Sequence, residues 1–164
     1  MNDALLIENE FKRAPGNVRL AVVHDGIEAR RYLEGVGAYA DRNRHPVPDV
    51  ILLDLKMPRF SGFDFLQWLR DESPDLSRLI LVIVLSSSPL QADVTRAYAL
   101  GANAYVVKPV DWNLFRDRIG MLATFWSRHV EKPSTAFKKL PNVPKPAAEK
   151  PAGRLKTGRD PTDL

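Results

Sequence analysis

Polar side chains follow three apolar segments of the sequence at the points where the segments end. Asp54 follows residues 50–53, Ser86 follows residues 79–85, and Lys108 follows residues 104–107. If these segments are parallel strands, their carboxyl ends meet at one edge of a sheet, where open α/β proteins bind ligands. A carboxylate, a hydroxyl and an ammonium would then supply a nucleophile, a hydrogen-bond donor and a positive charge at one place.

Each of these residues also has an ordinary structural explanation. An Asp after a strand is commonly a turn or cap residue, serines after a strand commonly cap the next helix, and a lone Lys is commonly solvated. What makes the combination specific is the fixed order of the three residues, with Met57 and Pro58 shortly after Asp54.

The apolar segments that would position these side chains are predicted to be strands. Residues 50–53 and 79–85 are apolar on both alternating faces, which is typical of strands covered on both sides in a parallel sheet. Residues 19–23, which Asp25 and Gly26 follow, and residues 104–107 are two weaker candidates. We therefore predict four strands.

Helical patterns lie around these strands. Residues 62–71 carry one apolar face, as do residues 90–100. Asp111 can cap a last helix with an apolar stripe at helical spacing: Phe115, Ile119, Leu122 and Trp126. The chain opens on a helix that Asp3 can cap, and no strand precedes it. The alternation of strand and helix predicts a doubly wound α/β domain.

Charge divides the chain into two parts. Residues 1–131 hold 16 basic and 17 acidic side chains, whereas residues 132–164 hold 8 and 3, together with six of the thirteen prolines. A segment so poor in large apolar residues cannot offset its ordering entropy. We therefore predict one domain over residues 1–131 and a disordered basic tail over residues 132–164. Nucleic-acid binding would depend on this tail alone, and we expect a solvated tail instead.

Composition excludes several classes of protein. The chain has no cysteine, which excludes disulfides, thiolate metal sites and cysteine nucleophiles. No apolar run reaches the roughly 18 residues of a membrane span, and no signal peptide is visible. We therefore expect a cytoplasmic protein.

Several motifs stand in a fixed order between residues 3 and 130: DVILLDLKMP at 49–58, GF at 62–63, LSSS at 85–88, RAY at 96–98, GANAY at 101–105 and VKP at 107–109. Together they resemble the receiver domain of two-component response regulators, a flavodoxin-like fold with strand order 2-1-3-4-5. GAYA at 37–40, with the basic loop that follows, resembles the stand-alone regulators that serve phytochrome-type histidine kinases.

The resemblance implies a role for each residue of the predicted site. Asp54 would be the phosphoacceptor, which attacks the phosphohistidine of a partner kinase. Mg²⁺, the Lys108 ammonium and a hydrogen bond from the Ser86 hydroxyl would meet the charge of the new phosphoryl group. The backbone carbonyl of Lys56 would be a metal ligand beside Asp54, and a cis peptide before Pro109 would aim Lys108 inward.

The resemblance also implies an output. Ser86 would move toward the phosphoryl group, and Tyr105 would rotate into the space it leaves and change the surface of the last two helices. The alternative for Tyr105 is an ordinary half-buried strand aromatic. No output domain follows, so we expect signalling by protein contact. Trp112, Leu114 and Phe125 lie off the core stripe of the last helix, where they form either a homodimer or partner face or ordinary edge packing.

The sequence departs from the receiver pattern at its start. Receivers begin with a strand that ends in two adjacent acidic residues, shortly before the Asp that starts the first helix. If Asp3 is that Asp, the acidic pair lies upstream of Met1. Only Asp54 and the Lys56 carbonyl would remain for Mg²⁺, so we expect a weak or incomplete site.

The strand that goes with the acidic pair is an interior one in this fold. Without it we expect the chain to fold poorly or to gain a strand from elsewhere, because its burial approaches the stability of a whole domain. A start codon assigned too late is the preferred explanation, and a genuinely shortened pseudo-receiver is the rival.

Three functions follow from these observations. The first is a single-domain response regulator that a sensor histidine kinase phosphorylates on Asp54. The second is an interaction module that works without phosphorylation, because its acidic pair is absent. The third is a phosphatase of the haloacid-dehalogenase type, which needs a second Asp where this chain has Lys56. We therefore do not expect an enzyme.

Overall fold

The computed structural model describes residues 3–16, 18–57, 59–128 and 130 of the chain. The first of the two units of the chain runs from Met1 to Lys132, and the described residues belong to it. The predicted tail at residues 132–164 lies outside the described residues, so its disorder stays a prediction. No helix in the described part of the chain is long and apolar enough to cross a membrane.

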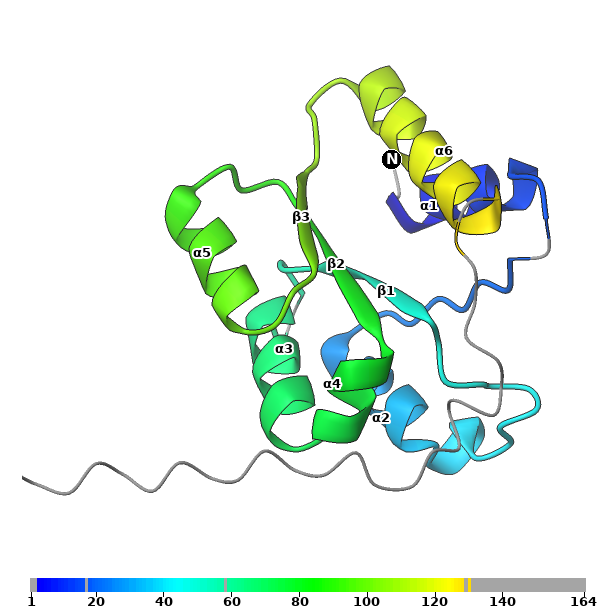
Figure 1. The fold of residues 1–164 in the computed structure, drawn as a ribbon, viewed down its shortest axis with the longest axis vertical. Helices are drawn as coiled ribbons and strands as arrows, with labels where there is room; N and C mark the ends of the chain where they lie inside the picture. The colour runs from blue at the N-terminus through cyan, green and yellow to red at the C-terminus, as the bar shows by residue number, and fades with distance from the viewer. Residues whose placement is uncertain (1–2, 17, 58, 129, 131–164) are drawn as a thin grey trace, which may run out of the picture. The chain divides into compact units, whose positions relative to one another are not determined.

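A three-stranded parallel sheet forms the centre of this unit (Figure 1). Its strands are β1 (Val50–Asp54), β2 (Leu81–Ser86) and β3 (Ala104–Val107), in the order β1-β2-β3. The apolar runs at these positions predicted the strands, because helices cover both faces of the sheet. β2 begins later than predicted, since Leu79 is the last residue of a short helix.

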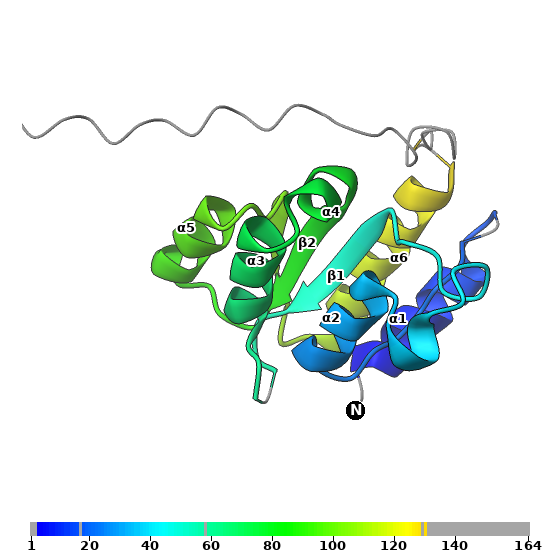
Figure 2. The same ribbon diagram turned by 90° about the horizontal axis from the view of Figure 1, so that it is seen from below.

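Helices cover the two faces of the sheet separately (Figures 1 and 2). Helices α1 (Asp3–Arg13) and α6 (Trp112–Arg128) lie together on one face. The opposite face carries α3 (Gly62–Asp71), α4 (Pro74–Leu79) and α5 (Gln91–Ala99). Helix α2 (Gly26–Glu34) lies beside β1 in Figure 2, and its Tyr32 and Leu33 belong to the core of that opposite face. A 3-10 turn, Gly37–Tyr39, follows α2. The sequence patterns predicted α1, α3, α5 and α6, and did not place α2 or the short α4.

Each face of the sheet has its own core. The core of the α1 and α6 face contains buried residues of both helices and of β2: Leu6, Phe11, Ile83, Leu85, Phe115, Ile119 and Ala123. The core of the opposite face contains Phe65, Leu66, Val82, Val84 and Ala97, among others. Alternate residues of β2 thus enter opposite cores, as the period of a strand requires.

The prediction of a strand at residues 19–23 is wrong, because the chain there is irregular. Among the described residues β1 pairs only with β2, so no neighbouring strand offers residues 19–23 a ladder. Val18 packs against the α1 and α6 core and Val23 against the opposite core, so this segment passes from one face of the sheet to the other.

The segment is also loosely packed. Leu20 and Val22 are 37% and 38% exposed. A hollow of about 270 Å³ is lined by residues 19–22 together with Tyr32, Tyr39 and His45. An extended segment without strand neighbours gains little from backbone pairing, which explains why its apolar composition alone did not make it a strand.

Candidate functional site

Asp54, Ser86 and Lys108 lie at the carboxyl ends of the three strands, where their sequence positions placed them. Lys108 Nζ donates a hydrogen bond to Asp54 Oδ2 over 2.6 Å, so a carboxylate and an ammonium meet at this edge of the sheet. The other carboxylate oxygen, Asp54 Oδ1, accepts a hydrogen bond from the backbone N–H of Lys56 at 2.9 Å. Each carboxylate oxygen of Asp54 is therefore held by a hydrogen bond.

Lys108 is held by its backbone as well as by its ammonium. Its N–H donates to the Ser86 carbonyl at 2.8 Å, and Arg118 of α6 donates to the preceding carbonyl at 2.8 Å. The side chain is only 13% exposed. Burial alone would lower the pKa of Lys108, but hydrogen bonds to Asp54 and Asp3 outweigh it and raise the pKa above its ordinary value. The ammonium therefore stays charged.

Asp3 is a site residue that the sequence did not reveal. It is the first residue of α1, where we expected only a helix cap. Its Oδ2 instead accepts a hydrogen bond from Lys108 Nζ at 2.9 Å. No motif marks this contact, because it depends on how the start of α1 lies against the end of β3.

Helix α3 begins close to Asp54 and fixes the end of the loop that follows it. A Cβ at Gly62 would lie 2.5 Å from the Asp54 carbonyl oxygen and 2.7 Å from Leu55 Cα, so only glycine fits there. Ser61 and Asp64 form a capping box, in which each side chain accepts a hydrogen bond from the other's backbone N–H. The hydrogen bonds from Ser61 lower the pKa of Asp64.

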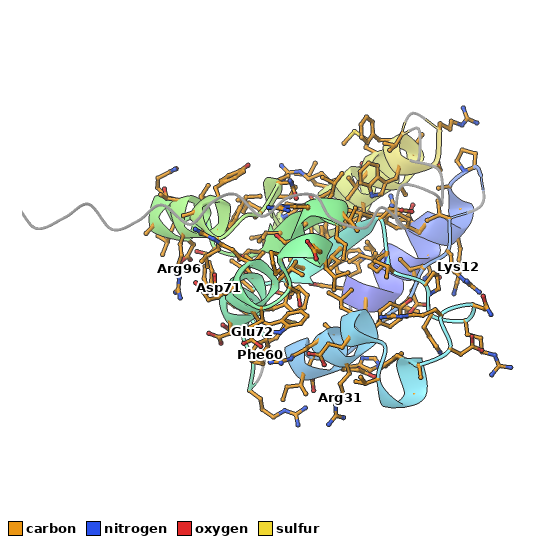
Figure 3. The ribbon with its side chains drawn as sticks, turned by 60° about the horizontal axis from the view of Figure 1, so that its bottom comes forward. Lys12, Arg31, Phe60, Asp71, Glu72 and Arg96 are labelled. Atoms are coloured by element: carbon orange, nitrogen blue, oxygen red, sulfur yellow. The ribbon has the colours of Figure 1, made fainter. Side chains whose placement is uncertain are left out.

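The middle of the same loop contacts the start of α2. Arg59 has a φ of 66°, a left-handed conformation that is uncommon outside glycine, and its guanidinium donates to Asp25, the N-cap of α2. Phe60 lies against Gly26, on the side of α3 that faces α2 (Figure 3). Lys56 is exposed, and the metal-binding role of its carbonyl stays a prediction.

Ser86 and Tyr105, the predicted switch residues, belong to one hydrogen-bond network. Ser86 is fully buried, and its Oγ accepts a hydrogen bond from Ser88 N at 3.1 Å. The Tyr105 hydroxyl donates to the Ser88 carbonyl at 2.9 Å, and Ser88 Oγ donates to Asp93 of α5 at 2.5 Å. The half-buried Tyr105 ring packs against the core of the α2 to α5 face. Its rotation stays a prediction.

The prediction of a cis peptide bond before Pro109 is wrong. The described residues contain no cis peptide bond. The trans form of an X–Pro bond is favoured by about 0.5–1 kcal/mol, so cis needs a specific cause. In this chain the cis form is not needed to direct Lys108 toward Asp54, because the lysine reaches Asp54 from the trans backbone.

The donors at this site fit a divalent cation only in part. No group of three or more His, Asp or Glu side chains in the described part of the chain is arranged to hold a metal ion. The two carboxylates that meet here, Asp3 and Asp54, share the Lys108 ammonium. A divalent ion would therefore depend on Asp54, the Lys56 carbonyl and ligands from outside the protein.

The outer side of α6 differs in part from what the sequence indicated. Leu114 and Phe125 are 44% and 52% exposed, as their position off the core stripe suggested. Trp112 is instead part of the packing, because it lies against the α1 and α6 core with its ring centroid 5.9 Å from that of Phe115. A contact face on α6 would therefore be built without Trp112.

Comparison with known proteins gives consistent matches in sequence and in structure. A family model described as the response regulator receiver domain matches residues 5–120. The chain is 30% identical to response regulator Rcp1 of Synechocystis sp. over 132 residues, which are 80% of this chain and 86% of that protein. The Mn²⁺-bound crystal structure of Rcp1 superimposes with a TM-score of 0.72 over 80% of this chain and 91% of that one.

Two further solved structures are similar. The phosphorylated cyanobacterial phytochrome response regulator RcpA is 32% identical, with a TM-score of 0.71 over 80% of this chain and 91% of that one. A response regulator in red light signaling of R. palustris is 35% identical, with a TM-score of 0.68 over 81% of this chain and 92% of that one.

Proposed function

The chain belongs to the family of response regulator receiver domains, and we propose that it receives a phosphoryl group on Asp54 from a histidine kinase. The observation that carries this proposal is the part-buried Lys108 ammonium 2.6 Å from Asp54 Oδ2, at the carboxyl edge of the sheet. The expected resemblance to regulators of phytochrome-type kinases is confirmed by the relatives. Receiver domains are regulators rather than classical enzymes, and we propose that this chain is a regulator.

The proposed step is a phosphoryl transfer. An oxygen of the Asp54 carboxylate attacks the phosphorus of a phosphohistidine, a P–O bond forms, and the P–N bond breaks. Its electron pair returns to the imidazole nitrogen, which takes a proton from water. The Lys108 ammonium offsets the negative charge that gathers on the phosphoryl oxygens, and hydrogen bonds with Ser86 and Arg118 already hold the backbone that positions it.

Ser86 and Tyr105 would carry the consequence of this step to the surface. Ser86 would leave Ser88 N and donate its hydroxyl to the phosphoryl group. Since Ser88 also holds the Tyr105 hydroxyl and contacts Asp93 of α5, a shift of this loop reaches both residues. A charge-assisted hydrogen bond is worth about 1.5–3 kcal/mol, enough for an allosteric coupling of about 1–3 kcal/mol.

Mg²⁺ would bind weakly at this site through Asp54 and the Lys56 carbonyl, with donor phosphate and water as its other ligands. When bound, it would neutralise part of the phosphoryl charge. The Mn²⁺-bound form of Rcp1 supports a divalent ion in this family, while the donor set of this chain argues for low affinity.

The partner that we propose is a sensor histidine kinase of the phytochrome type, because Rcp1 and RcpA are among the relatives found. This partnership would place the chain in the cytoplasm with the kinase domain. The exposed residues of α5 and α6, Tyr98, Leu114 and Phe125, support a homodimer or partner face on the last two helices.

A labelling experiment tests the phosphoacceptor. The full chain is incubated with acetyl phosphate and Mg²⁺, and the phosphoprotein is measured by mass spectrometry. We expect one phosphate that is stable in acid and labile in base, and we expect Asp54→Asn to abolish it. Asp75→Asn, which removes an exposed carboxylate from the first turn of α4, is the matched control. Labelling that survives Asp54→Asn would refute the proposal.

The second candidate is an interaction module that works without phosphorylation. The observation that favours it is the incomplete metal donor set of the described residues. Under this alternative, Asp54→Asn would leave kinase or partner binding unchanged and acetyl phosphate would leave no label on the chain. The same experiment therefore separates the two candidates.

A further inference from the structure

One part-buried ammonium, that of Lys108, is shared by two carboxylates that come from different elements. Lys108 Nζ lies 2.9 Å from Asp3 Oδ2 and 2.6 Å from Asp54 Oδ2. The lysine side chain is 13% exposed, whereas Asp3 and Asp54 are 43% and 40% exposed. The lysine is therefore the most enclosed member of the trio, and two more exposed carboxylates share its ammonium.

Asp3 connects this trio to a helix that packs closely on α6. Leu6 and Phe11 of α1 are buried in the same core as Phe115 and Ile119 of α6. The two helices also approach closely at Gly120, where an added Cβ would lie 3.5 Å from a carboxylate oxygen on α1. A displacement of the first turn of α1 can therefore be transmitted to the interface between α1 and α6.

We infer that Asp3 is a positioning residue of the phosphorylation site, and that phosphorylation of Asp54 draws the Lys108 ammonium away from Asp3. This inference rests on the proposed phosphorylation of Asp54. A phosphoryl group brings a charge of about −1.5 to −2 and three acceptor oxygens, so it outcompetes a single partly exposed carboxylate for the ammonium. Asp3 then faces greater negative charge without its partner, and the first turn of α1 is released from the site.

The coupling works in both directions, since a contact that phosphorylation breaks must also oppose phosphorylation. Asp3→Asn should therefore raise the phosphorylated fraction at subsaturating acetyl phosphate. A partly exposed ion pair is weak, so the expected rise is about two- to fivefold. Asp3→Glu keeps the charge and should stay close to the wild-type fraction.

The test follows the full chain by mass spectrometry for the label on Asp54 and by hydrogen exchange for the amides of α1. In the wild type, acetyl phosphate with Mg²⁺ should accelerate exchange in α1, and in Asp3→Asn this response should be absent although the label is present. Glu8→Gln is the matched control, because it removes a carboxylate from the same helix, about 8 Å further along its axis. The ion-pair partner of Glu8 is the exposed Lys12 of α1 rather than Lys108.

Three results would overturn the inference. One is a labelled wild type whose α1 exchange does not change, which needs no variant at all. Another is an Asp3→Asn protein that keeps the α1 response of the wild type. The third is a loss of label in Asp3→Asn that additional Mg²⁺ restores, because Asp3 would then be a metal ligand. Absence of label in the wild type would instead reject the proposed function, and the inference with it.

Discussion

β1 and β2 are parallel neighbours of similar composition, yet they are held in place in different ways. β2 pairs on both sides, and all its residues after Leu81 are buried. β1 pairs only with β2 among the described residues, and only Leu53 in it is fully buried. Asp54 stands on this less enclosed strand, so its position depends on Lys108 and on the loop that follows it more than on strand pairing.

Truncation of equivalent leucines in the two strands measures this difference. Leu85 of β2 and Leu52 of β1 face the same core, but Leu85 is 2% exposed and Leu52 is only partly buried. Leu85→Ala should cost about 3 kcal/mol of unfolding free energy, in the range for buried leucines, and Leu52→Ala about half of that. Urea unfolding followed by tryptophan fluorescence measures both. Equal losses would show that β1 is enclosed as fully as β2.

Gly62→Ala tests how firmly the end of β1 is held by the start of α3. The new Cβ would clash with the backbone of Asp54 and Leu55 at 2.5 and 2.7 Å, which flexible side chains cannot relieve. We expect a loss of about 1–3 kcal/mol of unfolding free energy, as for overpacked sites, and less label on Asp54. Gly120→Ala in α6 is the control, because its Cβ would make an ordinary 3.5 Å contact and should not destabilise. If the unfolding free energy and the label on Asp54 are both unchanged in Gly62→Ala, the loop can move away from Asp54.

The same contrast explains what could be predicted from the sequence. Continuous apolar runs predicted β1, β2 and β3, and apolar periodicity predicted α3 with its observed bounds at residues 62–71. These are local signals, and in each case the tertiary structure agrees with them. The prediction of a strand at residues 19–23 failed because a strand also needs a neighbouring strand to pair with, and a local sequence pattern does not show whether one is present.

The site was predictable to a similar extent. The positions of Asp54 and Lys108 after their strands predicted that they meet, because the carboxyl ends of parallel strands share one edge. The contact of Asp3 with Lys108 joins residues 105 positions apart through the packing of α1, and no spacing rule indicates it. The cis bond before Pro109 was implied by resemblance alone, and the backbone of this chain does not have it.

Ser61→Ala tests the capping box that begins α3 beside the site. Loss of the N-cap hydrogen bond to Asp64 N should cost about 1 kcal/mol of unfolding free energy near neutral pH. The pKa of Asp64 is lowered in the folded state, so its contribution is present above the ordinary value of 3.8 and is lost as the pH falls through the folded pKa. The difference in stability between wild type and variant should therefore become smaller in acid, while the part that comes from the N-cap hydrogen bond to Asp64 N remains. If the difference in unfolding free energy stays constant with pH, the capping hydrogen bond does not depend on the charge of Asp64.

The smallest effect that we predict concerns Glu28 of α2, which is the helix beside β1 on the side where the described residues provide no second strand (Figure 2). Glu28 accepts hydrogen bonds from the Tyr39 hydroxyl at 2.6 Å and from His24 N at 2.7 Å. The hydrogen bond to Glu28 raises the pKa of Tyr39 to about 12, so the stability it contributes is present below the ordinary value of 10.0 and is lost as the pH rises through about 12.

An ultraviolet titration of the tyrosines measures this shift directly. One phenol should ionise near pH 12, Tyr39→Phe should remove that transition, and Tyr98→Phe should leave it in place. Glu28→Gln should bring the Tyr39 transition back toward its ordinary value of 10.0, because the acceptor loses its charge. If Tyr39 titrates normally in the wild type, the contact with Glu28 is too weak to hold the loop. The open side of β1 would then be less ordered than its hydrogen bonds indicate, and the difference from β2 would be larger still.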